Sequence, residues 1–162
     1  MKTKIRVKKS AKKETKKIFN IADKESFKKD SSGSLIPLAM HTIETLVEDG
    51  NFYSGYYEDK FAGCVSLIEY NGMVELRSLV VKEKYREKGI SSRLIEKCKK
   101  EAEKRGYNRL YALIKENNYG LFKKHEFYQA EKPPQKLERD CNKCPTYGDC
   151  KEEAFVYEIK KP

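Results

Sequence analysis

The stretch from residue 73 to residue 114 constrains the fold more than any other part of the chain. "MVELRSLVV" (73–81) is apolar and rich in strand-forming residues, and "RLYALI" (109–114) is a second short apolar run. Between them, residues 90–106 place apolar side chains at helical spacing and end at a glycine, which is typical of a helix terminus. A strand, a helix and a strand joined in this way form a parallel pair with a right-handed crossover. The chain must therefore contain at least one parallel strand pair with a helix packed on it.

An antiparallel meander is predicted immediately before this unit. "FYSGYY" (52–57) and "FAGCVSLIEY" (61–70) are separated by a short polar turn, and Asn71-Gly72 joins the second run to the strand at 73–81. Asn-Gly between two such runs is a strong signal for a tight hairpin. Joined to the parallel pair, these strands predict a mixed, mostly antiparallel sheet.

The two ends of the chain complete the expected architecture. Ser10 is predicted to cap a helix at 11–24, with Glu14 near the capping-box position. The other predicted elements are strands at 3–8, 127–131 and 153–160 and helices at 36–50, with Pro37 near its first turn, and 119–126. No internal repeat or domain boundary is visible, so residues 1–162 are expected to form one α/β domain with helices on both faces of the sheet.

Composition narrows the class of protein. The 162 residues are 38% hydrophobic and 37% charged, a foldable mixture without an apolar run near the ~20 residues of a membrane span. The basic start "MKTKIRVKKSAKKETKK" lacks the apolar stretch of a secretory signal, so a cytoplasmic location is expected. The net charge of +10 comes mainly from lysines interleaved with glutamates, as in "IEKCKKEAEKRG". This pattern is typical of solvated helix faces and argues against nucleic acid, although a basic surface also attracts a polyanionic ligand.

The loop between the strand at 73–81 and the following helix has the features of an anion site. Free N–H groups at a helix start, together with the helix dipole, favour a phosphate. Gly89 would let the backbone approach it closely, Arg86 and Lys88 add positive charge, and Ser91 is small. The alternative is an ordinary turn that contains a glycine.

"VELRSLVVKEKYREKGISSRLIE" and the later "NNYGLFKKHEF" resemble the acetyl-CoA-binding core of the GNAT N-acetyltransferase superfamily. Arg86, Gly89 and Ser91 stand at the positions of its R-x-x-G-x-G/A motif. The tail "KLERDCNKCPTYGDCKEEAFVYEI" is also similar to the single-domain N-acetylglutamate synthase-like branch. Leu38 and Ala39 stand where that branch has Arg and Ser, and losing the Arg weakens the case for a glutamate acceptor.

The resemblance implies an N-acetyltransferase with acetyl-CoA as co-substrate. It implies that Leu79, Val80 and Val81 pair with the pantetheine arm as if with another strand, and that a main-chain N–H near Leu79 or Val80 binds the acetyl oxygen. It implies further cofactor contacts at Asn117 and Phe122. The pyrophosphate would be held by the loop and helix start, at Arg86, Glu87, Lys88, Gly89, Ile90, Ser91 and Ser92.

Two charged residues on the strand at 73–81 are candidates for the acceptor side of the reaction. Glu75 is the candidate base that deprotonates the attacking amine, and its alternative role is a surface carboxylate paired with a lysine. Arg77 lies on the same face by strand alternation and could bind a substrate carboxylate, or it could form an ion pair with Glu75. The superfamily's usual acid, a Tyr in the short helix, is Phe122 here. Tyr119 is the nearby alternative, although a packing role is expected for it.

Three of the five cysteines, Cys141, Cys144 and Cys150, fall within "CNKCPTYGDC". Thiolates at C-x2-C spacing suit zinc or an iron–sulfur cluster, but a fourth ligand is not evident. A structural zinc, three reduced cysteines and a labile disulfide all remain open. Cys64 and Cys98 are expected to be small buried residues.

The expected function is transfer of an acetyl group to a small amine, with a glutamate-like amino acid favoured and amino-acid metabolism as its setting. A protein or peptide amine is the first alternative. A basic nucleic-acid-binding module and a catalytically silent acetyl-CoA-binding regulator are the others. The expected partner is a small-molecule substrate, without a membrane, and a homodimer is left open.

Overall fold

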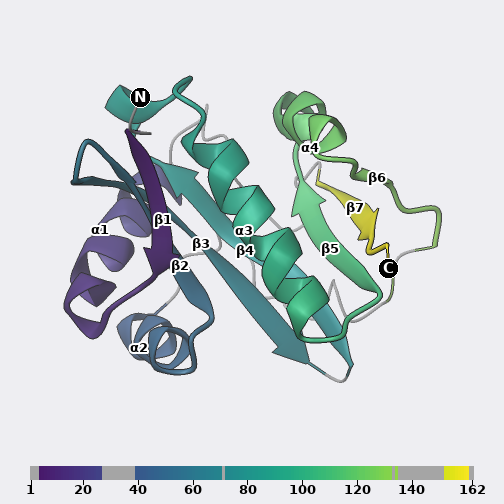
Figure 1. Ribbon diagram of the computed structural model, residues 1–162, viewed down its shortest axis with the longest axis horizontal. Coiled ribbons are helices and arrows are strands. Elements are labelled where there is room, and N and C mark those ends of the chain that lie inside the picture. The colour runs from purple at the N-terminus through teal and green to yellow at the C-terminus, as the bar shows by residue number, and fades with distance from the viewer. Residues whose placement is uncertain (1–3, 27–38, 71, 133, 135–151, 161–162) are drawn as a thin grey trace.

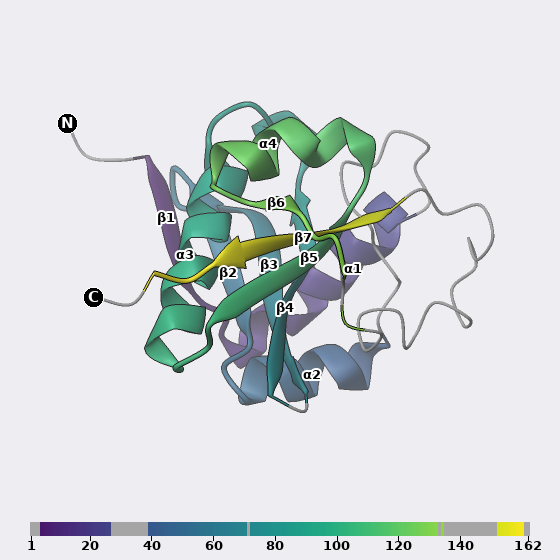
Figure 2. The same ribbon diagram turned by 90° about the vertical axis from the view of Figure 1, so that its right-hand side faces the viewer.

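A seven-stranded mixed sheet forms the centre of the structure (Figure 1), a computed structural model that describes residues 4–26, 39–70, 72–132, 134 and 152–160. The strand order is β1-β2-β3-β4-β5-β7-β6. The strands are β1 (Ile5–Lys9), β2 (Phe52–Tyr57), β3 (Lys60–Tyr70), β4 (Met73–Val81), β5 (Arg109–Ile114), β6 (Tyr128–Gln129) and β7 (Glu153–Glu158). Only β4 and β5 pair in parallel among these strands, and Figure 2 shows β7 between β5 and β6. The mixed, mostly antiparallel sheet predicted from the sequence is confirmed.

Helices cover both faces of this sheet (Figures 1 and 2). One core cluster joins helix α3 to β2, β3, β4 and β5, and a second joins α1 and α2 to the opposite face of β2, β3 and β4. The predicted apolar face of α3 is confirmed, because Ile90, Leu94, Ile95, Cys98 and Ala102 are all buried. The helices are α1 (Thr15–Ser26), α2 (Met40–Glu48), α3 (Ile90–Lys104) and α4 (Tyr119–Lys124), with 3-10 turns η1 (Lys12–Glu14), η2 (Glu83–Tyr85) and η3 (Glu116–Asn118).

The start of the first helix differs from the prediction. Ala11, rather than Ser10, is the cap residue, and its N–H donates to Glu14 Oε1 at 2.7 Å. Ser10 is instead buried, with its hydroxyl 2.7 Å from that of Ser54 on β2. The prediction at Glu14 was therefore correct, and the one at Ser10 was wrong because a tertiary hydrogen bond takes the hydroxyl. At the second helix, α2 begins at Met40 with Ala39 as its cap, and Pro37 lies outside the described residues.

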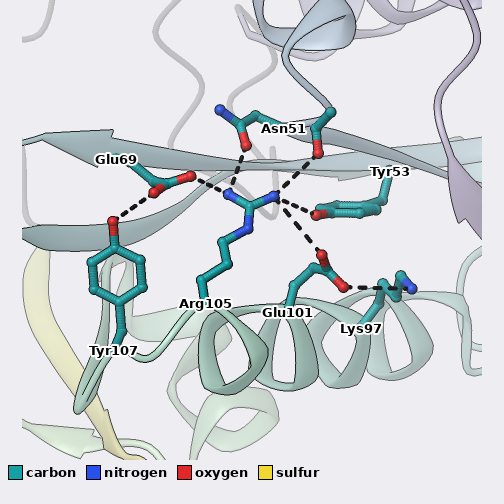
Figure 3. A network of polar contacts seen from close by, with 8 residues as sticks. Asn51, Tyr53, Glu69, Lys97, Glu101, Arg105 and Tyr107 are labelled. Carbon is teal, nitrogen blue, oxygen red and sulfur yellow. Dashed lines mark hydrogen bonds and ion pairs between the residues drawn. The ribbon is translucent and has the colours of Figure 1, made fainter.

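A polar network fastens the C-terminal end of α3 to β2 and β3 (Figure 3). The Arg105 guanidinium donates to Asn51 Oδ1 at 2.7 Å, to the Tyr53 hydroxyl at 3.1 Å and to a carboxylate oxygen of Glu69. Tyr107 donates its hydroxyl to the other oxygen of Glu69 at 2.6 Å. Burial and this bond raise the pKa of Tyr107 to about 12, so the phenol remains a donor at neutral pH. The network fixes one end of α3 while the other end remains available for a ligand.

The chain turns sharply after α4 through a left-handed residue that is not glycine. Phe127 N–H bonds to Phe122 O and Glu126 N–H to Lys123 O, both at 3.0 Å, which is the Schellman pattern of helix termination. Glu126 carries the required positive φ of 69°. The rings of Phe122 and Phe127 pack edge to face at 5.1 Å and complete the motif. A residue with a Cβ is strained at this position.

Replacing Glu126 by Gly is therefore expected to stabilise the protein by about 1 kcal/mol, because Gly adopts this φ without strain. The ion pair lost with Lys160 joins two exposed groups and contributes little. For a chain of this size the melting temperature should rise by about 2–4 °C, measured by differential scanning calorimetry. Glu126→Ala removes the same ion pair and keeps the strain, so it should give no increase. An equal increase in both variants would contradict the explanation.

Among the helices within the described ranges, none is long and apolar enough to cross a membrane.

Candidate active site

The N-terminal end of α3 presents main-chain N–H groups to a short loop from β4. Glu87 and Gly89 both adopt positive φ, of 63° and 89°, and Gly89 is the cap residue of the helix. The first bond of the helix runs from Arg93 N–H to Gly89 O at 3.2 Å. The N–H groups of residues 90–92 precede that bond and so have no acceptor within the helix. This arrangement provides donors for an anion, as the sequence predicts.

The Arg86 side chain binds this loop to the end of β4. Its Nε donates to the carbonyl of Val81, the last residue of β4, at 3.2 Å. The side chain thus fastens the loop to the strand. Lys88 and Lys84 lie on the rings of Tyr57 and Tyr85, at 5.2 and 5.1 Å from the ring centroids, and add to the positive charge around the loop.

β4 carries a bulge just before its end. Ser66 of β3 pairs with Arg77 and Cys64 with Val80, so β4 advances three residues where β3 advances two. Ser78 adopts a positive φ of 54°, and Ser66 Oγ donates to the carbonyl of Arg77 at 3.0 Å. A bulge leaves the main-chain groups of its extra residue out of the ladder. An irregular amide near Leu79 or Val80 is the feature that the family resemblance implies.

β4 and β5 diverge after a short parallel contact. Their register comprises Glu75 with Tyr111 and Leu76 with Ala112, although β4 continues to Val81 and β5 to Ile114. Figure 1 shows the two strands separating toward the end where α3 begins and α4 lies. The bulged part of β4 therefore lies beyond the paired part of the two strands, toward the end where α3 begins.

Glu75 and Arg77 lie on the same face of β4, as strand alternation predicts. Glu75 is 2% exposed, and Arg77 Nε lies 3.9 Å from its Oε1. This ion pair was one of the two roles expected for Arg77. On the same side, Met73 and Tyr111 belong to a small apolar cluster, whereas Leu76 packs toward α3. The face of β4 opposite α3 thus carries a buried carboxylate and a partly buried guanidinium.

The remaining predicted residues lie farther from this arrangement or pack in the core. Asn117 is exposed in η3, whereas the Phe122 side chain is buried against Phe127. Tyr119 packs on the ring of Phe155 at 4.8 Å, which agrees with the packing role expected for it. Cys64 and Cys98 are fully buried, and burial raises the pKa of both thiols above the ordinary value, so neither is suited to act as a nucleophile. Cys141, Cys144 and Cys150 lie outside the described residues.

Two glycines that position the site were missed. A Cβ on Gly63 would lie 2.4 Å from the carbonyl of Val80, so only Gly allows β3 to approach the bulged end of β4. A Cβ on Gly55 would lie 3.0 Å from Ile90 Cγ2, at the first residue of α3. Both glycines interrupt strand patterns in the sequence, and such a glycine often marks a bulge or a close approach. That signal was present and could have been used.

A mixed sheet whose parallel strands diverge beside a helix N-terminus is an arrangement suited to an anionic ligand. The profile of the acetyltransferase (GNAT) family matches residues 15–130. The N-acetyltransferase CT2212 of Chlorobaculum tepidum is 34% identical over 119 residues, which are 71% of this chain and 76% of that protein. The chain therefore belongs to the acetyltransferase (GNAT) family and is an N-acetyltransferase.

Solved structures agree on the fold. The N-acetylglutamate synthase of Neisseria gonorrhoeae, complexed with coenzyme A and N-acetyl-glutamate, superposes with a TM-score of 0.80 at 16% identity. The match covers 99% of this chain and 36% of the synthase chain. Rv2747 of Mycobacterium tuberculosis, in complex with CoA and NLQ, gives a TM-score of 0.78 at 17% identity, over 96% of this chain and 99% of that one. The GNAT fold expected from the sequence is confirmed.

Proposed function

We propose that this N-acetyltransferase moves an acetyl group from acetyl-CoA to the amine of a small amino acid, with a glutamate-like acceptor favoured. The observation that carries the proposal is the meeting of three features at one place. They are the bulge in β4, the divergence of β4 from β5, and the N–H groups at the start of α3 that have no acceptor within the helix.

The carrier would lie across these three features. The N–H groups of residues 87–92 would hold the pyrophosphate, reinforced by the dipole of α3. Main-chain groups of Leu79 to Val81 would pair with the pantetheine arm where β4 no longer pairs with β5. Arg86 would contribute charge and keep the loop in place through its bond to Val81.

The reaction that fits this geometry is direct attack of the amine on the thioester carbon. The C–N bond forms, the C–S bond breaks, and the electron pair leaves with the CoA sulfur. An N–H of the bulge near Leu79 or Val80 would stabilise the oxyanion of the intermediate. Glu75 would accept the proton of the ammonium group, directly or through a water. Phe122 has no proton to give, and Tyr119 packs on the ring of Phe155, so the thiolate would leave without a protein acid.

An acceptor carboxylate is supported by Arg77. Its side chain is 17% exposed, and its guanidinium lies beside Glu75 on the face opposite α3, where an amino acid could bind both residues. The N-acetyl-glutamate in the Neisseria synthase complex also supports this acceptor class. A protein or peptide amine is the second candidate. The position of Leu38, where the resembling branch has Arg, lies outside the described residues.

The proposal is tested in two stages. Titration with acetyl-CoA should raise the melting temperature. A ligand at 100 times its dissociation constant adds about 2.7 kcal/mol to the free energy of unfolding. Release of free thiol is then followed with amino acids, polyamines and peptides as acceptors. Turnover with peptides alone would indicate that the acceptor is a protein or peptide amine. Stabilisation without turnover on any amine would indicate a silent acetyl-CoA-binding protein, and the absence of stabilisation would overturn the proposal.

Glu75→Gln should lower kcat by about 100-fold or more with the acceptor found in this panel, because the amide cannot accept the proton. Activity of the variant should recover as the pH approaches the pKa of the amine, since the acceptor then arrives deprotonated. Steady-state kinetics between pH 6 and pH 10 measure both effects. Glu103→Gln changes an exposed carboxylate on α3 and serves as the control. A wild-type kcat and pH profile in Glu75→Gln would show that Glu75 is not the base.

A further inference from the structure

A buried polar cluster joins the middle of α3 to the end of α4. Lys99 is 9% exposed, and its Nζ donates to the carbonyl of His125 at 3.0 Å and to Glu96 Oε1 at 3.1 Å. The same carboxylate oxygen lies 2.7 Å from His125 Nδ1. Lys99 Nζ also lies 4.2 Å from the centroid of the Tyr157 ring. The cluster thus connects α3, the residue after α4 and β7.

Lys99 departs from the interpretation of "IEKCKKEAEKRG" as a solvated helix face. It follows the buried Cys98 and is itself buried, unlike the exposed Lys100. A buried ammonium group is costly unless it has partners, and here it has a carboxylate, a carbonyl and an aromatic face. Burial alone would favour the protonated form of Glu96, but the hydrogen bonds from His125 and Lys99 lower the pKa of this carboxyl below its ordinary value. The carboxylate therefore remains charged at neutral pH and supports the buried ammonium group.

The contact is made beside α4, the helix that lies near the end of β5 where β4 and β5 diverge. α4 follows β5 after the single turn η3, on the side where the two strands diverge (Figure 1). The helix has only six residues, and its terminal turn uses the carbonyls of Phe122 and Lys123 for its own closure. Two residues after Lys123, the carbonyl of His125 is the one that Lys99 binds. A short helix of this kind depends on tertiary contacts for its position.

We infer that Lys99, with Glu96 and His125, is a positioning cluster that holds α4 against α3 and so fixes the width of the slot for the pantetheine arm. The inference rests on the proposed site of acetyl-CoA. Lys99 touches neither the carrier nor the reacting atoms in this account. Its effect reaches them through α4 alone.

Two ligands distinguish an effect on the slot for the pantetheine arm from an effect on the helix N-terminus. Acetyl-CoA occupies both, whereas adenosine 3′,5′-bisphosphate carries nucleotide phosphates and lacks the pantetheine arm. In isothermal titration calorimetry, Lys99→Met should weaken acetyl-CoA binding about 10-fold, a loss of about 1.4 kcal/mol. Binding of the bisphosphate should change less than about 2-fold, because the start of α3 is held by other contacts. Lys99→Arg keeps the cation and should restore most of the affinity, and Lys100→Met, an exposed neighbour, should bind both ligands as the wild type does.

Each outcome bears on one claim. Unchanged acetyl-CoA binding by Lys99→Met overturns the inference, and so does equal weakening of both ligands, which would indicate a general loss of structure. If Lys99→Met does not fold, Glu96→Gln replaces it, because this partly exposed side chain can lose its charge with little change in volume. It should weaken acetyl-CoA selectively and by a smaller factor, and equal affinities would again overturn the inference. Failure of the wild-type protein to bind either ligand would instead contradict the proposed function.

Discussion

Gly89→Asp should weaken acetyl-CoA binding by about 100-fold or more while the protein remains folded. The new carboxylate would lie at the start of α3, where it repels the pyrophosphate and accepts hydrogen bonds from the N–H groups that should hold it. Loss of two charge-assisted hydrogen bonds at about 1.5–3 kcal/mol each accounts for this factor. The protein should remain folded with a loss of about 1 kcal/mol, because Asp pays a backbone cost at this positive φ, which its favourable place at a helix N-terminus partly offsets.

The matched control for this variant is Gly106→Asp at the other end of the same helix. Gly106 has a φ of 86°, almost that of Gly89, and a Cβ there meets nothing within 4 Å. It therefore carries the backbone cost of the substitution without a charge at the proposed anion site. Calorimetric titration should show wild-type affinity for Gly106→Asp and loss of binding for Gly89→Asp. Wild-type affinity in both would mean that residues 86–92 form only a turn.

Arg105→Met should give the largest loss of stability, about 3 kcal/mol. Methionine keeps much of the apolar stem but removes the guanidinium that binds Asn51, Tyr53 and Glu69 (Figure 3), on a side chain that is only 20% exposed. Breaking such a partly buried pair leaves the Glu69 carboxylate without its cation and the Tyr53 hydroxyl without its donor. For a chain of this length the melting temperature should fall by about 6–12 °C.

Chemical denaturation with urea measures this loss, with Lys104→Met as the control. Lys104 is the exposed neighbour in the last turn of α3, so its replacement should cost only a few tenths of a kcal/mol. Arg105→Lys should be intermediate, because a lysine keeps the charge and loses the fork that reaches several acceptors. A loss below about 1 kcal/mol for Arg105→Met would mean that the network adds little to the net stability.

Much of the fold could be predicted because its signals are local. Asn71-Gly72 marked a hairpin, and the apolar spacing of residues 90–102 marked the buried face of α3. Ser10 shows where local signals fail, since its hydroxyl bonds to Ser54, 44 residues away, instead of capping the helix. The prediction of a solvated helix face fails at Lys99 for the same reason, because the carbonyl that this side chain binds belongs to His125, in a distant part of the chain.

The sequence by itself determined the βαβ unit, the mixed sheet and the glycine-bearing helix start, because these follow from periodicity and turn chemistry within short segments. The same residues also pointed to the acetyltransferase family, which the comparisons confirm. Only the tertiary structure decided that β4 bulges at Ser78, that it diverges from β5, and that the face carrying Glu75 and Arg77 is buried, with the two charges paired. These features depend on the register between strands and on the fit of Gly63 against Val80, which are contacts between residues far apart in the chain.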